Sequence, residues 1–112
     1  MSGLTVRQTP IEGLLVFDIP LHGDARGWFK ENWQRAKMLE VGLPDFGPVQ
    51  NNMSFNAAAG STRGLHAEPW DKMISLAHGR IFGAWVDLRP GEGFGSVFRS
   101  EEHTSELQSR QC

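Results

Sequence analysis

The sequence has no tyrosine and one cysteine, Cys112, which is its last residue. One cysteine excludes an intramolecular disulfide framework and a metal site built from several thiolates. No apolar run approaches the roughly 20 residues that a membrane-spanning helix needs. The first residues, MSGLTVRQTPIEG, also lack the basic-then-apolar pattern of a secretory signal. We therefore expect a cytoplasmic protein with no membrane partner.

An excess of charge of one sign is also lacking. The 11 basic and 13 acidic residues give a formal net charge of -2, and the two signs are interspersed until the last dozen residues. No basic stripe is present, which argues against a nucleic-acid partner. A chain of 112 residues suits one domain with a modest core. Any anionic ligand must therefore be bound by a few local cations.

Short apolar runs bounded by turn residues predict an all-β protein. Segment 80–89, RIFGAWVDLR, is the clearest strand, and its alternation puts Phe82, Ala84 and Val86 on one face. His78-Gly79 suits the turn of a hairpin between segments 71–77 and 80–89. The remaining strands are expected at 13–19, 28–33, 48–56 and 97–98, with turns at 21–27, 57–61 and 90–96.

One helix is expected, over residues 32–41. Asn32 suits its N-terminal cap, Gly42 suits the left-handed position after its last turn, and Pro44 blocks its continuation. Short strands with a single helix describe a sandwich or a barrel. The roughly six expected strands are fewer than the eight or so of a closed jelly roll.

The residues from Arg99 onward, RSEEHTSELQSRQC, differ from the rest of the chain. Leu107 is their only apolar residue before the final cysteine, and this polar composition predicts disorder. The stretch RSEEHTSELQS also resembles the in-frame translation of a common sequencing-adapter oligonucleotide. We therefore expect a truncated domain at 1–98 and a non-native polar tail at 99–112.

Four side chains able to do chemistry lie within ten residues: Arg63, His66, Glu68 and Lys72. A neutral imidazole such as that of His66 is a ready base. Lys72 could stabilise an oxyanion formed after proton removal, and the guanidinium of Arg63 suits a phosphate. In a regular strand Arg63 and His66 point to opposite faces. A common site therefore requires a bulge, for which Gly64 is the natural place.

Each of these residues also has a structural interpretation. A lone histidine beside apolar residues is most often structural, and Arg63 could form a surface ion pair with Glu68. The spacing from Gly60 to Gly79 resembles the first conserved motif of cupin barrels. In metal-binding cupins the position of Lys72 is a glutamate ligand, and an ammonium repels a divalent cation. We therefore expect no metal, although a metal cupin that uses His66 and Glu68 stays open.

Several segments together resemble the dTDP-4-dehydrorhamnose 3,5-epimerase family. DARGWFKE, PVQNNMSFN, STRGLHAE and DKMISLAHGRIFGAWVDLRPG, followed by FGSVF, come in that family's order and approximate spacing. The resemblance covers nearly all of residues 13–98. It implies the N-terminal half of a cupin jelly roll with one short helix, a homodimer in the intact protein, and no cofactor.

The resemblance also implies a nucleotide-diphosphate sugar substrate and an isomerase activity in rhamnose biosynthesis or a related deoxysugar route. Family members invert C3, C5 or both of dTDP-4-dehydro-6-deoxyglucose by abstracting a proton next to the C4 ketone. His66 matches the family's base, and Lys72 matches the lysine beside the C4 oxygen. The segment between them, AEPWD, is shorter than usual. Matches to the family's substrate contacts are Arg26, Glu31, Gln50, Asn52 and Arg63.

The family's general acid is a tyrosine in the second half of the barrel. Because the chain has no tyrosine, we expect it to be inactive by itself. The main alternative is a cupin that binds a nucleotide sugar without acting on it, which would use Arg26, Arg63 and the amides of Gln50 and Asn52. Without the resemblance, a turn-capping role is favoured for Arg26, and a structural role for Asp87.

Overall fold

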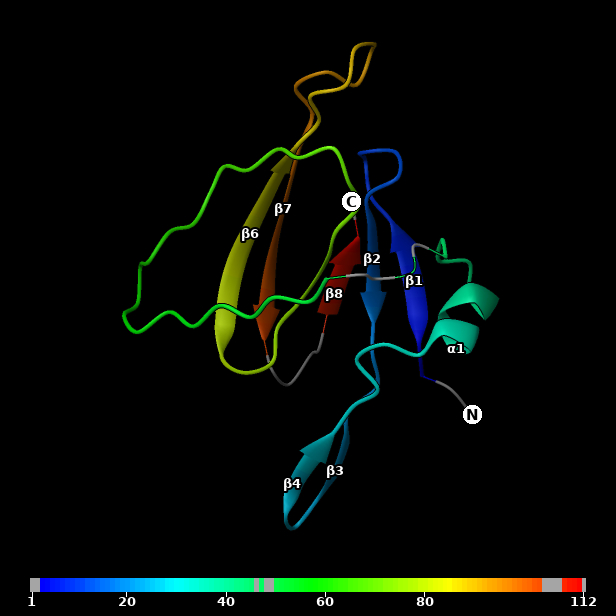
Figure 1. The fold of residues 1–112 in the computed structure, drawn as a ribbon, viewed down its shortest axis with the longest axis vertical. Coiled ribbons are helices and arrows are strands. Elements are labelled where there is room, and N and C mark those ends of the chain that lie inside the picture. The colour runs from blue at the N-terminus through cyan, green and yellow to red at the C-terminus, as the bar shows by residue number, and fades with distance from the viewer. Residues whose placement is uncertain (1–2, 46, 48–49, 104–107, 112) are drawn as a thin grey trace.

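The computed structural model describes residues 3–45, 47, 50–103 and 108–111. Within them it is built mainly of strands, with one short helix, as predicted. The strands form three antiparallel sheets, ordered β1-β2-β8-β5, β3-β4 and β6-β7. The elements, drawn in Figure 1, are β1 (Thr5–Gln8), β2 (Leu15–Asp18), β3 (His22–Asp24), β4 (Gly27–Phe29), α1 (Arg35–Glu40), β5 (Met73–Ser75), β6 (Arg80–Val86), β7 (Val97–His103) and β8 (Gln108–Gln111).

The core lies between the four-stranded sheet and the helix. Neighbouring side chains of a strand point to opposite faces, yet Val16 and Phe17 of β2 are only 1% and 0% exposed. The predicted strand at 13–19 is therefore an interior strand, with β1 on one side and β8 on the other. Burial of an apolar side chain of this size contributes about 1.5–3 kcal/mol. Phe17 belongs to the main buried cluster, which comprises Leu4, Phe17, Ile19, Met38 and Leu43.

The helix begins later than predicted, because the cap is Gln34 and not Asn32. The side-chain oxygen of Gln34 accepts a hydrogen bond from the backbone N–H of Lys37 at 2.9 Å. Trp33, just before the cap, packs against the core cluster. The predicted C-terminal signal is confirmed, since Gly42 has a φ of 98°.

Gly42→Ala should destabilise the protein through the backbone alone. A Cβ at this position would meet nothing within 4 Å, so the cost is that of the left-handed conformation, about 1–2 kcal/mol. Urea unfolding followed by circular dichroism measures it. Gly42→Asn is the control and should lose less, because asparagine enters this region more readily. Equal losses in both variants would contradict the assignment.

The predicted hairpin between segments 71–77 and 80–89 is wrong. Both segments contain strands, and Gly79 has the φ of a turn residue, 97°. However, β5 pairs with β8 and β6 pairs with β7, so the chain passes from one sheet to another at this turn. Partner choice depends on strands that are distant in sequence, which a local turn signal cannot specify.

Strands also occur in the segment for which we predicted disorder. β7 continues from Val97 to His103, and β8 lies between β2 and β5. Backbone hydrogen bonds join β7 to β6, and β8 to β2 and β5. Such bonds require no apolar side chain. The origin of residues 99–112 and the domain boundary at residue 98 stay predictions. Residues 104–107 and Cys112 lie outside the described part of the chain.

The apolar side chains of β6 are only partly covered. Phe82, on the face predicted to be apolar, is 64% exposed. The indole of Trp85 lies over Gly83. It is so close that a Cβ on Gly83 would lie 2.5 Å from the indole Cη2. The indole also faces Phe98 of β7 across the hairpin, with ring centroids 6.0 Å apart. Glycine at position 83 is therefore required by the close approach of the indole.

Residues 50–56 form no strand, although segment 48–56 was predicted to be one. They run without sheet pairing into the expected turn at 57–61, where the Ser61 N–H donates to the Ala58 carbonyl. In Figure 1 this segment forms part of the wide green loop that precedes β5. A strand needs a neighbouring strand, and none of the described residues provides one here. Residues 48 and 49 lie outside the described part.

Asp87 fastens the loop between β6 and β7, as its predicted structural role requires. Its carboxylate accepts hydrogen bonds from the backbone N–H and the Nε of Arg89, at 3.0 and 2.9 Å. Nη2 of Arg89 donates to the Glu12 carbonyl at 2.6 Å, which ties the loop to the turn before β2. The hydrogen bonds from Arg89 lower the pKa of Asp87 below its ordinary value.

Asp87→Asn should therefore destabilise the protein in a pH-dependent way. The folded-state pKa is lower than the unfolded one, so the carboxylate stabilises the fold above the unfolded pKa of about 3.9, and the contribution is lost as pH falls through the folded pKa. The urea midpoint should fall at pH 7, and the difference from the parent should shrink below about pH 4. Asp71→Asn, an exposed control, should change it little. A difference that is independent of pH would contradict this role.

Candidate functional site

The predicted catalytic residues lie on the irregular segment that precedes β5. Residues 50–71 are exposed throughout, and Lys72 is half-buried. Nζ of Lys72 lies 2.6 Å from a carboxylate oxygen of Glu68, four residues earlier. Glu68 therefore pairs with Lys72. The predicted alternative, a surface ion pair between Arg63 and Glu68, is not formed. The ion pair fixes the ammonium at the end of this segment, next to the start of β5.

Arg63 closes the turn that precedes it. Its Nε donates to the side-chain oxygen of Asn56 at 2.7 Å, and its Nη2 donates to the Phe55 carbonyl at 3.2 Å. The guanidinium therefore links the two extended stretches on either side of residues 57–61. An exposed guanidinium held in this way still has a free N–H edge for an anion, because arginine carries five donors.

The predicted bulge at Gly64 is not formed, because residues 61–72 belong to no strand. The φ of Gly64 is 121°, and a Cβ placed there would lie 3.5 Å from the His66 ring. His66 is exposed. Within the described residues, no hydrogen bond or ion pair joins His66 to Lys72 or to Arg63. Gly64 has a conformation that favours glycine, but the three side chains are not assembled into one site.

Arg26 lies far from this segment, at the tip of the β3-β4 hairpin that projects from the body of the molecule (Figure 1). Its side chain is 91% exposed and lies 2.6 Å from Asp24. The Arg26 N–H also donates to the Asp24 carboxylate at 2.8 Å, and these bonds lower the pKa of Asp24. The local geometry is thus the turn-capping arrangement that we expected for Arg26 without the family resemblance.

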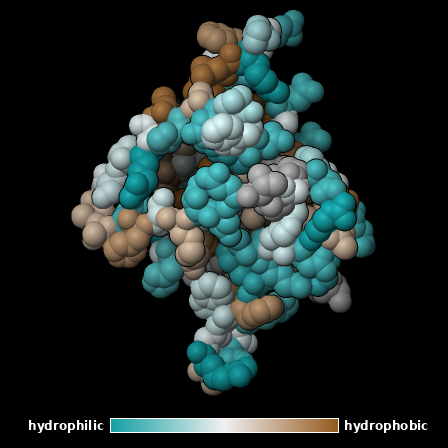
Figure 2. Space-filling model, in the orientation of Figure 1, coloured by the Kyte–Doolittle hydropathy of each residue, from teal (hydrophilic) through white to brown (hydrophobic). Residues whose placement is uncertain are grey.

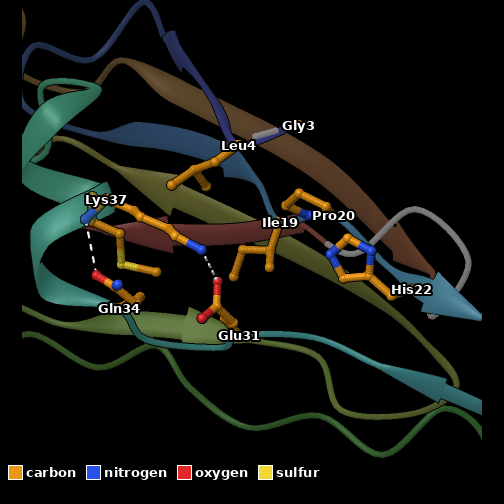
Figure 3. A pocket seen from close by; sticks show the side chains of 9 residues that line it. Gly3, Leu4, Ile19, Pro20, His22, Glu31, Gln34 and Lys37 are labelled. Atoms are coloured by element: carbon orange, nitrogen blue, oxygen red, sulfur yellow. Dashed lines mark hydrogen bonds and ion pairs between the residues drawn. The ribbon is translucent and has the colours of Figure 1, made fainter. Parts of the chain in front are cut away.

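Glu31 lines a small pocket beside the helix, with a volume of about 60 Å³. Figure 3 shows its carboxylate facing the ammonium of Lys37, at a distance of 2.6 Å, with His22 on the other side of the pocket. Of the predicted substrate-binding residues, only Glu31 reaches this pocket. A cavity of this size is far too small for a nucleotide sugar, because ligand pockets measure about 300–1,000 Å³.

The structure brings together only some of the predicted site. Nε2 of Gln50 donates to the Asn52 side chain at 3.5 Å, so these amides are neighbours. A second cavity, lined by Arg80, Ile81, Phe82 and Glu101, contains none of the predicted site residues. Neither of these two cavities contains more than one of the seven predicted side chains. The physical reason is that segment 50–72, which carries five of them, has no layer of structure over it.

Lys30 makes a polar contact that was not predicted from the sequence. Its Nζ donates to the Leu76 carbonyl at 3.0 Å, which connects the end of β4 to the end of β5. Burial lowers the pKa of Lys30. The only sequence signal is a lysine next to aromatic residues in WFKENW, and it does not indicate a partner 46 residues away.

The described residues offer neither a metal site nor a membrane-spanning helix. They contain no group of three or more histidine, cysteine, aspartate or glutamate side chains placed to hold a metal ion. None of their helices is long and apolar enough to cross a membrane.

Comparison with known proteins identifies relatives of the chain. The profile of the dTDP-4-dehydrorhamnose 3,5-epimerase family matches residues 8–109. A protein RmlC homolog of Streptococcus pyogenes serotype M6 is 58% identical over 95 residues, which cover 80% of this chain and 48% of that protein. A dTDP-4-dehydrorhamnose 3,5-epimerase of Escherichia coli is 33% identical over 92 residues, which cover 78% of this chain and 49% of the relative. The chain thus spans about half the length of these relatives.

Solved structures match nearly the whole chain. RmlC from Streptococcus suis in complex with dTDP-D-xylose aligns with a TM-score of 0.84 and 45% identity, over 96% of this chain and 61% of that one. The dTDP-4-dehydrorhamnose 3,5-epimerase of Bacillus anthracis, with TDP and PPi bound, aligns with a TM-score of 0.85 and 26% identity, over 97% of this chain and 65% of that one. These neighbours confirm the predicted fold class, an incomplete cupin jelly roll.

Proposed function

We propose a nucleotide-sugar epimerase function, on the premise that the chain belongs to the dTDP-4-dehydrorhamnose 3,5-epimerase family, whose profile matches residues 8–109. The proposed activity is that of a protein as long as these relatives, of whose length this chain spans about half. Such a protein inverts C3, C5 or both of dTDP-4-dehydro-6-deoxyglucose. It acts in the cytoplasm as a homodimer. The observation that carries the proposal is the superposition, with a TM-score of 0.84, on a relative in complex with dTDP-D-xylose.

The proposed chemistry is proton abstraction next to a ketone. The C3 and C5 protons are acidic because removing either gives an enolate whose charge rests on the C4 oxygen. His66 takes the proton, because an imidazole is the side chain used most often as a general base. Lys72 donates a hydrogen bond to the developing oxyanion. Its ammonium has three donors, so the 2.6 Å contact with Glu68 leaves others for the substrate.

The remaining predicted residues bind the nucleotide and sugar. Arg63 offers the unoccupied edge of its guanidinium to a phosphate. Gln50 and Asn52 present amides on the stretch whose Phe55 carbonyl accepts a hydrogen bond from Arg63. Arg26 and Glu31 complete the proposed substrate contacts. The Glu68–Lys72 pair also favours lysine chemistry over metal ligation, because an ammonium 2.6 Å from the carboxylate competes with a divalent cation.

The 112-residue chain itself is proposed to be inactive. Its base and oxyanion-binding lysine lie on an exposed segment, where water screens the electrostatic stabilisation that a closed site provides. It also contains no tyrosine, the residue type that returns the proton in the family. Water could return a proton to the enolate in place of the tyrosine, but it is not held in position as a donor.

Deuterium wash-in tests both parts of the proposal. We would join residues 1–98 to the part of the Streptococcus suis protein that follows its counterpart of residue 98, and call this fusion the chimera. In deuterated buffer with the keto sugar, the chimera should introduce deuterium at C3, C5 or both, detected by mass spectrometry and NMR. The 112-residue chain should show no exchange above the buffer.

Two outcomes would contradict the proposal. Rapid exchange catalysed by the 112-residue chain would show that this fragment is not inactive. A chimera that unfolds cooperatively and binds TDP, but exchanges no proton, would favour a cupin that binds nucleotide sugars without acting on them. The intact Streptococcus suis protein is the positive control.

A further inference from the structure

The β3-β4 hairpin has little structure of its own to hold it in place. Its strands have three residues each, all of these residues are exposed, and within the described part of the chain the two strands pair only with each other. In Figure 1 the hairpin projects from the body, and Figure 2 shows a narrow protrusion there with hydrophilic residues at its tip. An isolated two-stranded hairpin is marginally stable at best in water. Contacts at its base must therefore fix its position.

Two side-chain contacts connect the base of the hairpin to the body of the molecule. Directly after β4, the Nζ of Lys30 donates to the Leu76 carbonyl at 3.0 Å. The next residue, Glu31, lies 2.6 Å from the Nζ of Lys37 in α1. Lys30 is half-buried and Leu76 is buried, whereas the side chains of Glu31 and Lys37 are 41% and 49% exposed. Water therefore competes less for the Lys30 bond than for the exposed ion pair.

The Leu76 carbonyl lies where it can act as an anchor. Leu76 follows Ser75, the last residue of β5 that pairs with β8. The strand β5 begins at Met73, directly after Lys72. The bond from Lys30 therefore joins the hairpin to the far end of the short strand that Lys72 precedes. Loss of the ammonium would take a donor from the carbonyl of a buried residue, which is unfavourable.

We propose that Lys30 is a positioning residue for substrate binding. It holds the β3-β4 hairpin against the end of β5, and through the hairpin it fixes Arg26 at the tip and Glu31 at the base. The inference rests on the proposed function, because Arg26 and Glu31 are two of the proposed substrate contacts. Lys30 itself is bonded to the Leu76 carbonyl and acts without touching the substrate.

This role predicts a change in substrate binding and not in the chemical step. The hairpin carries no residue assigned to proton transfer, since His66 and Lys72 lie in the segment before β5. A hairpin without its anchor must be ordered each time the substrate binds, and such ordering weakens binding. Binding lost equally from the ground state and the transition state raises KM and leaves kcat unchanged. A purely structural lysine would lower the stability without this split.

The test replaces Lys30 with methionine in the 112-residue chain and in the chimera. Lys30→Met keeps the apolar stem of the side chain and removes its donors. In the free 112-residue chain, hydrogen exchange measured by mass spectrometry should become faster in residues 22–31. In the chimera, the KM of deuterium wash-in should rise about fivefold or more, with kcat within a factor of about two. The dissociation constant of dTDP-D-xylose, the ligand of the Streptococcus suis relative, should rise with KM.

Two variants serve as controls. Lys30→Arg keeps a cationic donor on a long side chain, so it should restore both the slow exchange and the parent KM. Arg35→Met removes the exposed contact between Arg35 and Asp45, which is also a charged contact but does not hold the hairpin. It should leave the exchange of residues 22–31 and the KM unchanged. Circular dichroism should show the same fold for all variants.

Unchanged exchange of residues 22–31 in Lys30→Met would overturn the proposal, because Lys30 would not hold the hairpin. Weaker binding without faster exchange in the free chain would also contradict it, since Lys30 would then contact the substrate directly. A kcat that falls while KM stays the same would count against it as well. Binding of dTDP-D-xylose requires no proton transfer. A chimera that binds this ligand but exchanges no proton would therefore contradict the epimerase function and still test the role of Lys30.

Discussion

The His66→Asn variant of the chimera is expected to lose deuterium wash-in by about 10²–10⁴-fold, the range of general acid–base catalysis. Asparagine preserves the polarity of the position but cannot accept the proton. Because His66 is exposed, the fold should survive the substitution, and the TDP affinity should stay within a factor of about two. The prediction is checked by the rates of exchange at C3 and C5, measured at saturating and at low substrate concentration.

His78→Asn is the matched control. His78 is also exposed and lies in the turn between β5 and β6, outside the proposed site, so its replacement should leave the wash-in rate unchanged. Lys72→Met should also slow exchange, because the oxyanion would lose its cation. If His66→Asn retained the parent rate while folding normally, His66 would not be the base and the family role would not apply to it.

Phe17→Ala is expected to remove most of the folding stability of the 112-residue chain. Phe17 is 0% exposed and belongs to the only large buried cluster found in the described residues. Truncating a fully buried phenylalanine costs about 3–5 kcal/mol, and small domains have only about 5–15 kcal/mol in total. Urea unfolding followed by circular dichroism should show a transition shifted to much lower urea or absent.

Phe94→Ala provides the comparison for this prediction, because Phe94 is 64% exposed. Its truncation should change the free energy of unfolding by no more than about 0.5 kcal/mol. Similar losses in the two variants would mean that the cluster around Phe17 is not the core. A loss confined to Phe17→Ala would locate the stability of the chain between the four-stranded sheet and α1.

The features predicted well from the sequence are those set by near neighbours in the chain. The apolar run at 13–19 contains β2, RIFGAWVDLR contains β6, and Gly42 ends the helix in the left-handed conformation. Each signal depends on a few consecutive residues. The Glu68–Lys72 contact is also local, since it joins residues four apart.

The features predicted poorly depend on partners that are distant in sequence. Segment 48–56 has the alternation of a strand, but alternation does not supply a neighbour, and its described part stays unpaired. The turn at His78-Gly79 was recognised, but it joins two sheets rather than two paired strands. The sequence could not indicate that Lys30 donates to the Leu76 carbonyl.

The candidate site shows the same division. Motif order identified the family and the residue types for its chemistry, and the family profile confirms that identification. The positions of His66, Lys72 and the substrate contacts relative to one another depend on the surrounding layers of the fold. Arg26 illustrates the difference, because its contact with Asp24 explains its local geometry completely without any substrate.

The close approach of Trp85 to Gly83 has a consequence for how the sequence can vary. A side chain at position 83 would occupy the volume that the indole fills, with only 2.5 Å between its Cβ and the ring. A relative with alanine or a larger residue at the position of Gly83 should therefore carry a smaller residue at the position of Trp85. Natural variants should change these two sites together, and an alignment deep enough to measure covariation should report them as a coupled pair.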